Sequence, residues 1–195
     1  MNKVKTAVQP VPTVHTATSL AIEELRAGLD ANLAWLDVAF GICEFVPIDS
    51  DTATKRSATK PGVYTGGSTG NNYTMLFPDD HPGNFSFFVV EYEDYQDLGM
   101  GVRPTVEFRL VFWFDYRKIY PTDHENRTIF NVQAEVLAAL EATKSRASQY
   151  RIDQFLYPKE RVYQGFSHNL IPGKDLMRPY GFFGLRGVMK VLENC

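Results

Sequence analysis

The sequence has few cysteines and no long hydrophobic run. Cys43 and Cys195 are the only cysteines among 195 residues, and their positions give neither a disulfide framework nor metal-ligand spacing. A reducing cytosol is therefore the simplest setting. No apolar stretch approaches the roughly 18 residues of a membrane-spanning helix, and the first residues lack the apolar core of a secretory signal. We expect no membrane partner, and synthesis in the cytoplasm.

A surplus of basic residues is also absent. Lys and Arg number 20 against 23 Asp and Glu, which gives a formal net charge of -3. Proteins that grip phosphate backbones usually show a concentrated basic surface, so tight nucleic-acid binding is not expected. A mildly acidic wall suits a channel through which DNA passes, because a basic wall would hold the phosphates.

Catalytic motifs are missing as well. There is no Gly-x-Ser-x-Gly elbow, no Cys–His signature and no His-Glu-x-x-His. The glycine-rich stretch 66–70 lacks the Gly-Lys-Ser/Thr ending of a phosphate loop and is better explained as a hairpin tip. His81 and His124 adjoin carboxylates, but sequence neighbours rarely point together, so turn and capping roles explain them better. We predict a non-enzyme with no catalytic residue, cofactor or metal.

The composition, 44% hydrophobic and 22% charged, is that of a globular protein. Its length suits a single domain, which we place at residues 18–195. Residues 1–17 mix Val, Thr and Pro with few large side chains, and this predicts an extended arm. Such an arm frays in a monomer or lies across a neighbour in an oligomer, and both readings stay open.

The most informative segment is 103–120. Apolar side chains occupy alternate positions from Val106 to Tyr116, with Glu107, Arg109 and Asp115 between them. This alternation predicts a long strand with one buried face.

The remaining elements alternate between helical and strand patterns. Ser19 is the expected N-cap of the first helix, and the capping-box pattern of Thr122 to Glu125 is expected to start the second. The predicted elements are a helix over 19–35, a strand over 38–48, a hairpin excursion over 60–77, a strand buried on both faces over 84–92, a helix over 122–145, a strand-like run over 151–157 and a terminal strand over 182–192. The fold class is therefore α+β: an antiparallel β-sheet with a long hairpin, flanked by an N-terminal helix and a helix packed on the sheet.

An aromatic run between two arginines, residues 178–186, has two readings. It can stack bases or fill a partner's pocket, or it can be a core strand with glycines at a bend. The core strand is favoured because only two charges lie in it.

This layout resembles the tail terminator, or tail completion, proteins of long-tailed bacteriophages. The resembling parts are the helix over 19–35, the 60–77 excursion, the paired strands over 85–92 and 106–116, the helix over 122–145 and the terminal run over 182–192. Residues 110–115 followed by 118–121 are also similar to small uncharacterised proteins of Bacteroidetes phages and prophages. The stretch 150–178 is longer than the layout requires, and its role is unassigned.

The resemblance implies a structural virion protein of the phage neck or tail. Such proteins form a homo-oligomeric ring, commonly a hexamer, that caps the tail tube and joins it to the head-completion or connector proteins. DNA passes through the ring with transient, non-specific contacts. The implied location is the virion, reached from the host cytoplasm during assembly, and no catalysis is involved.

Two sets of residues are candidates for this role. Acids that face the DNA channel or its rim are Glu91, Glu93, Asp94 and Asp97. A hairpin tip that contacts the neighbouring ring comprises Gly66, Gly67, Ser68, Asn71 and Asn72. Each set is equally compatible with an ordinary surface loop.

Two other functions stay open. One is a protein–protein adaptor outside phage biology. The other is a ligand-binding or enzymatic α+β domain with an aromatic pocket, whose lining would be Trp113, Tyr116, Tyr120 and Tyr163.

Overall fold

In the described chain, a run of strands lies between the first helix and the later helices. The structure, a computed structural model, describes residues 16–48, 58–64, 73–78, 83–97, 102–143 and 148–192. Their elements are, in chain order, α1 (Thr16–Asn32), β1 (Val38–Ile42), β2 (Glu44–Ile48), β3 (Ala58–Tyr64), β4 (Tyr73–Met75), β5 (Phe85–Asp97), β6 (Val102–Asp115), α2 (Tyr116–Ile119), α3 (Ile129–Ala142), β7 (Ser148–Leu156), α4 (Lys159–Val162), the 3-10 turns η1 (His168–Leu170) and η2 (Gly173–Leu176), and β8 (Tyr180–Val191). The predicted α+β class is confirmed.

Two sheets organise the fold. The main sheet has five strands in the order β1-β5-β6-β8-β7, and the second has the order β2-β3-β4. Strands β5, β6, β8 and β7 pair antiparallel, whereas β1 joins β5 in parallel. The main sheet is therefore mixed, and not wholly antiparallel as expected.

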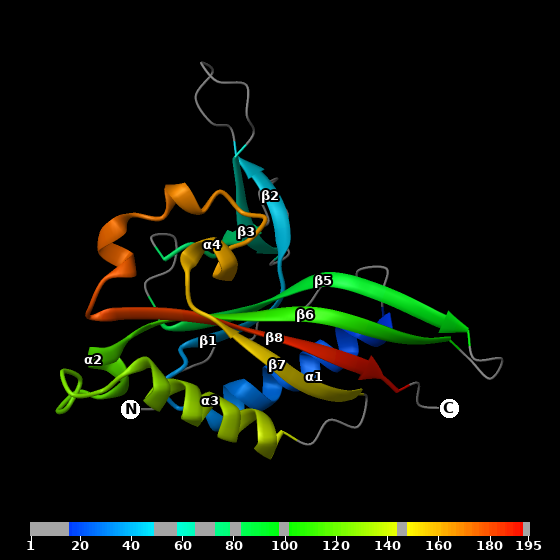
Figure 1. Ribbon diagram of the computed structural model, residues 1–195, viewed down its shortest axis with the longest axis horizontal. Coiled ribbons are helices and arrows are strands. Elements are labelled where there is room, and N and C mark those ends of the chain that lie inside the picture. Colours follow the sequence, from blue (N-terminus) through cyan, green and yellow to red (C-terminus); the bar gives the residue numbers. More distant parts are fainter. Residues whose placement is uncertain are drawn as a thin grey trace.

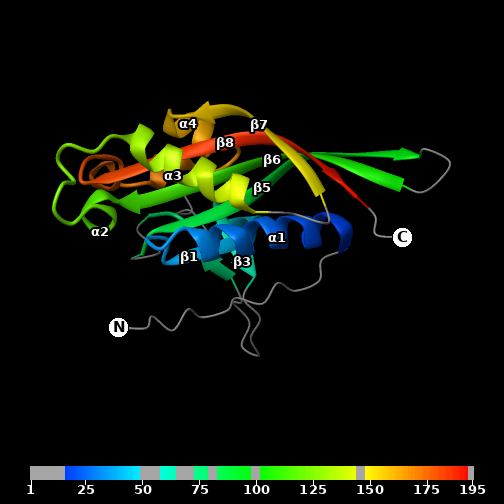
Figure 2. The ribbon, with the colours of Figure 1, turned by 90° about the horizontal axis from the view of Figure 1, so that it is seen from below.

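The main sheet separates two hydrophobic cores. Helices α1 and α3 cover one face, called here the helical face, while α4 and the β2–β3 strands lie over the other, called here the opposite face (Figure 1). The core on the helical face includes Leu25, Phe112 and Val136, and that on the opposite face includes Phe87 and Trp113. Figure 2 shows α1 and α3 from below, lying along the sheet.

Strand β6 lies at the centre of both cores. The predicted alternation holds, because Val106, Phe108, Leu110, Phe112 and Phe114 are all buried on the helical face. The prediction of a single buried face is wrong, since the intervening Arg109, Val111 and Trp113 are buried as well. The strand also ends at residue 115, where the chain turns into α2.

The segment 38–48 was expected to form one strand, and it forms two. β1 pairs with β5, and after Cys43 the chain continues as β2 in the second sheet. Cys43 marks the change, and its backbone N–H still donates to Phe88 O at 2.8 Å. Hydrophobicity runs through both strands, so the sequence pattern alone does not reveal the division.

Both long helices differ from their predicted bounds. α1 begins at Thr16 and not at Ser19, and its Leu20 is 63% exposed. α3 begins at Ile129, because residues 121–126 form turns. The capping pair is Thr128 and Asn131: Thr128 N donates to Asn131 Oδ1 at 2.9 Å, so the Thr122–Glu125 capping box is wrong.

The stretch without an assigned role, 150–178, has a structural one. It contains most of β7, then α4, η1 and η2, and its Val162, Tyr163 and Phe166 are buried in the core on the opposite face. The run 178–186 enters β8, in which Phe183 and Leu185 are fully buried. The core-strand reading of that run is confirmed.

Strands β5 and β6 form a hairpin that extends past the rest of the sheet. They pair as far as Asp97 and Val102, whereas β6 pairs with β8 only as far as Thr105. In both views the hairpin reaches beyond the ends of α1 and α3 (Figures 1 and 2).

Candidate functional site

The four predicted rim acids all belong to β5, but the structure separates their surroundings. A β-bulge between Val90 and Tyr92 leaves Glu91 as the extra residue. Glu91 turns toward the opposite face, where its carboxylate oxygens lie 3.4 Å from Arg109 Nε and 2.8 Å from Arg186 Nε. Only 16% of the Glu91 side chain is exposed, so this acid belongs to an ion-pair cluster.

The other three acids lie further along the hairpin. Glu93 faces the helical side and accepts a 2.5 Å hydrogen bond from Thr18 Oγ1 in α1. Asp94 is half-buried and pairs in register with Thr105 of β6. Asp97 ends β5, and its side chain is not among those described. The four acids therefore do not form one continuous surface, and Asp94 is the best remaining candidate among the described side chains.

The predicted hairpin tip falls outside the described residues. Gly66, Gly67, Ser68, Asn71 and Asn72 all lie between β3 and β4. These two strands pair antiparallel, from Gly62 with Met75 to Tyr64 with Tyr73. The hairpin connection itself is therefore as predicted, while the role of its tip stays a prediction.

A buried arginine joins the sheet to the cover on the opposite face. Only 2% of the Arg109 side chain is exposed. Its guanidinium donates to Arg161 O and to Gln164 O, both at 2.8 Å, where α4 ends. Burial lowers the pKa of Arg109 from its usual value, and the charge of Glu91 works in the other direction. The sequence marked Arg109 only as a polar interruption on an exposed face.

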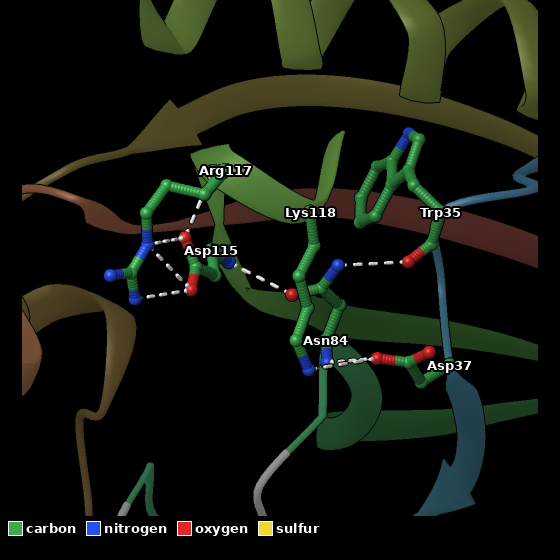
Figure 3. Close-up of polar contacts among 6 residues, drawn as sticks. All are labelled: Trp35, Asp37, Asn84, Asp115, Arg117 and Lys118. Atoms are coloured by element: carbon green, nitrogen blue, oxygen red, sulfur yellow. Dashed lines mark hydrogen bonds and ion pairs between the residues drawn. The ribbon is translucent and has the colours of Figure 1, made fainter. Parts of the chain in front are cut away.

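A second polar cluster gathers the ends of several strands (Figure 3). Asn84 is fully buried; its Nδ2 donates to Trp35 O at 2.9 Å, and its Oδ1 accepts from Asp115 N at 2.8 Å. Its backbone N–H donates to Asp37 Oδ2 at 2.9 Å, and Lys118 Nζ lies 3.5 Å from the same oxygen. One asparagine thus ties together the segments that lead into β1 and β5 and the end of β6.

Asp115 completes this cluster as the N-cap of α2. Its carboxylate accepts from the backbone N–H of Arg117 at 2.9 Å and from the Arg117 guanidinium at 2.7 Å. Burial raises the pKa of Asp115, but the hydrogen bonds from Arg117 outweigh that effect, so the pKa ends below its usual value. The carboxylates here are committed to partners that fix the chain, which favours a structural role for the cluster.

The proposed aromatic pocket does not form. Trp113 and Tyr163 belong to the core on the opposite face, whereas Tyr116 and Tyr120 belong to or pack against the core on the helical face. The sheet lies between the two pairs, so the four rings cannot line one cavity. This removes the observation on which the ligand-pocket alternative depended.

A shallow groove of about 390 Å³ lies between the end of α1 and α3. Small side chains, including Ala34, Ala138 and Ala142, line most of it. Its one acid, Glu135, accepts from Trp35 Nε1 at 3.0 Å and from the Tyr120 hydroxyl at 2.6 Å. Both carboxylate oxygens are thus occupied by the protein's own donors, and the groove presents mainly an apolar surface.

The predicted arginine–aromatic run contributes to a second cavity of about 230 Å³, lined by Tyr116, His124, Glu125, Arg178 and Pro179. The Arg178 guanidinium donates to the backbone carbonyls of residues 124, 125 and 127 and lies 5.0 Å from the centre of the Tyr116 ring. Its donors are directed at the turn before α3. Arg178 therefore holds the turn in place and offers little to a ligand.

Buried nucleophiles are held in unreactive forms. Cys43 is buried, and burial raises the pKa of its thiol well above its usual value, which keeps it protonated. Burial likewise raises the pKa of the Tyr163 hydroxyl. Within the described ranges, no group of three or more His, Cys, Asp or Glu side chains is placed to hold a metal ion.

None of the described helices is long and apolar enough to cross a membrane. Comparison of the chain with protein-family models and with curated protein sequences finds no match.

Proposed function

We propose that this protein is a structural component of a bacteriophage neck or tail. In this role it forms a ring that terminates the tail tube and joins it to the head-completion or connector proteins, with DNA passing through its channel. Its location is then the virion, and it carries out no reaction.

The observation that supports this function best is the projecting β5–β6 hairpin. It continues the main sheet beyond the helices (Figures 1 and 2). On the same strand, just before the projecting part, Tyr92 pairs in register with Glu107 and is 58% exposed. Tyrosine is enriched among the residues that dominate binding energy at protein interfaces, and a projecting hairpin can reach a neighbouring subunit. The hairpin therefore serves as the projecting element of the resembling family, a role that the sequence had assigned to 60–77.

The polar interior supports the same proposal. The charged groups in the described interior bond to backbone or to one another: Arg109 to the end of α4, Asp115 to α2 and Glu91 to two arginines. These contacts make a rigid sheet, which is what a ring needs to keep its subunits in a fixed geometry.

The test is the mass of the purified protein over a concentration series, measured by light scattering after size-exclusion chromatography, with electron micrographs of any large species. A closed ring, commonly hexameric in the resembling family, is the expected result. Pull-down of tail-tube and connector proteins from a phage lysate identifies the neighbours. A protein that neither self-associates nor copurifies with virion particles would contradict the proposal.

The predicted arm gives a further check. A chain that begins at Thr16 keeps every element described here, because α1 starts at that residue. We expect the truncated protein to keep the wild-type circular dichroism spectrum and thermal midpoint while assembling only at higher concentration. Loss of the folded state on truncation would show that residues 1–15 belong to the core, and the arm would then not be an intersubunit strap.

A further inference from the structure

We propose that neighbouring copies join edge to edge, with β7 of one copy pairing antiparallel to the outer half of β5 of the next, so that the main sheet continues from subunit to subunit. This inference rests on the proposed ring and names its interface. It follows from two unpaired strand edges, their relative directions and the side chains that they carry.

The two edges lie on opposite sides of the main sheet. β1 pairs with β5 only from Phe85 to Phe88, so β5 has no described strand partner on its outer side from Val89 to Asp97. β7 is the last strand at the other side, and no described strand lies along its outer edge. Unpaired edges of this length present a row of backbone donors and acceptors to another strand.

The strand directions favour a head-to-tail arrangement. The pairs β5–β6, β6–β8 and β8–β7 are all antiparallel, so β5 and β7 run in opposite directions within one copy. Rotation about an axis along the strands therefore brings β7 of one copy antiparallel to β5 of the next. Antiparallel pairing is the more stable kind, and a heterologous contact of this type gives a ring when the rotation between copies closes.

Apolar side chains determine how the two faces of β7 line up with the two faces of β5 across the junction. On the helical face, the half-buried Val90 lies at the β5 margin of the core, and the half-buried Tyr150 and Ile152 lie at its β7 margin. Placing these margins together covers apolar surface from both copies. A one-residue slip between the strands would move every side chain of one strand to the other face of the sheet. Only every second register therefore keeps these apolar side chains together on the helical face.

The same registers bring opposite charges together on the opposite face. There β5 carries Tyr92 and Asp94, whereas β7 carries Arg151, and β8 beside it carries Lys190. Arg151 lies 2.6 Å from Asp153, but its side chain is 77% exposed, so this pair is weak and easily exchanged. Pairing β5 with β5 would instead oppose acid with acid, and β7 with β7 would oppose arginine with arginine.

The experiment uses the full chain with Arg151→Glu, Asp94→Arg and the two changes combined. Each single change places like charges across the junction, and we expect it to raise the concentration needed for assembly by about ten-fold or more. The combined variant restores opposite charges, and we expect it to assemble as the wild type does. Glu107→Arg is the matched control, because Glu107 is exposed on the same face but lies on the inner strand β6.

A second measurement locates the contact directly. The double variant Asp94→Cys with Arg151→Cys is made in a Cys195→Ser background and treated with a short bismaleimide, which links two nearby thiols. Cys43 stays unreactive because it is buried. We expect a ladder of linked subunits, whereas Glu107→Cys with Arg151→Cys gives none. Circular dichroism and thermal midpoints equal to those of the wild type establish that each variant is folded.

The outcomes separate this inference from the proposed function. Rings that are unaffected by either charge reversal and give no 94–151 ladder would overturn the edge pairing and leave the ring intact. A dimer that links 94 to 94 or 151 to 151 would overturn it too, in favour of a two-fold contact. A monomer up to the solubility limit would overturn both the pairing and the self-assembling ring.

Discussion

The two faces of the main sheet are covered in different ways. On the helical face, α1 and α3 bury an apolar core with residues such as Leu29, Val136 and Phe112. On the opposite face, the cover is a three-stranded sheet, the short helix α4 and two 3-10 turns, and the main sheet beneath it contributes the buried Arg109. A long helix satisfies most of its own backbone hydrogen bonds, whereas short irregular segments leave carbonyl groups that need a donor.

Arg109 supplies that donor. It satisfies two carbonyls where α4 ends, and its charge is balanced by a carboxylate that the β-bulge places beside it. The cover on the opposite face therefore depends on a buried polar anchor, whereas the cover on the helical face depends mainly on apolar packing. This difference predicts that mutations on the two faces have distinct effects on stability.

Phe112→Ala should have the largest effect. Phe112 is fully buried on the helical face and stacks on Phe183 at 5.1 Å between ring centres. The cavity left behind should lower the free energy of unfolding by about 3–5 kcal/mol, measured by chemical denaturation. Phe130→Ala is the matched control, since Phe130 is 66% exposed and its loss should change stability by less than about 0.5 kcal/mol. Equal effects at the two positions would contradict the packing described here.

Arg109→Met should lower the free energy of unfolding by about 3 kcal/mol, because it breaks a buried ion pair. The loss should lie at the low end of the usual range, since Glu91 keeps Arg186 as a partner. The loss should be local: amide hydrogen exchange should rise most around Val162 to Gln164. Arg151→Met, at a 77% exposed side chain, is the control. If exchange rose equally on the helical face, Arg109 would not be a specific anchor of the opposite cover.

Asn84→Ala tests the junction that both faces share. The change leaves Trp35 O and Asp115 N without their side-chain partner in a buried site, and we expect a loss of about 2 kcal/mol. Asn32→Ala serves for comparison, because the Asn32 side chain donates to Gly28 O from an exposed position. Equal small losses from both changes would show that the junction is dispensable.

Asp115 should make the smallest contribution to stability, and acid should remove it. Its pKa is lowered in the folded state, so its stabilising effect is present above the unfolded value of about 4 and is lost as the pH falls through the folded value. The stability difference between the wild type and Asp115→Asn should shrink below about pH 4. A difference that stays constant across that window, measured by urea unfolding, would contradict the role of the carboxylate charge.

The elements with strong periodicity were predicted well, and their bounds less so. The alternation of β6 and the 3.6-residue period of α1 and α3 depend on side chains within one segment, which the sequence displays. The wrong start of α3 came from a local capping pattern at Thr122, which competed with the Thr128–Asn131 pair. The division at Cys43 was missed because both of its strands are hydrophobic.

The candidate site was harder to predict than the fold. Four acids close together in sequence suggested one surface, but a bulge at Glu91 and the alternation of β5 direct Glu91 and Glu93 to different faces and different partners. The β7 edge, central to the proposed interface, carries no motif, and its role depends on its place in the strand order. A possible signal was the exposed, charge-bearing pattern of 148–156, which resembles an edge strand.

The sequence by itself determined the α+β class, the buried stripe of β6 and the apolar faces of the two long helices, because local periodicity specifies which side of an element avoids water. The burial of β6 on both faces, the anchoring of α4 by Arg109 and the outer edges of β5 and β7, which no described strand pairs with, became visible in three dimensions. These properties depend on which segments become neighbours in space, and contacts between residues far apart along the chain have no period in the sequence.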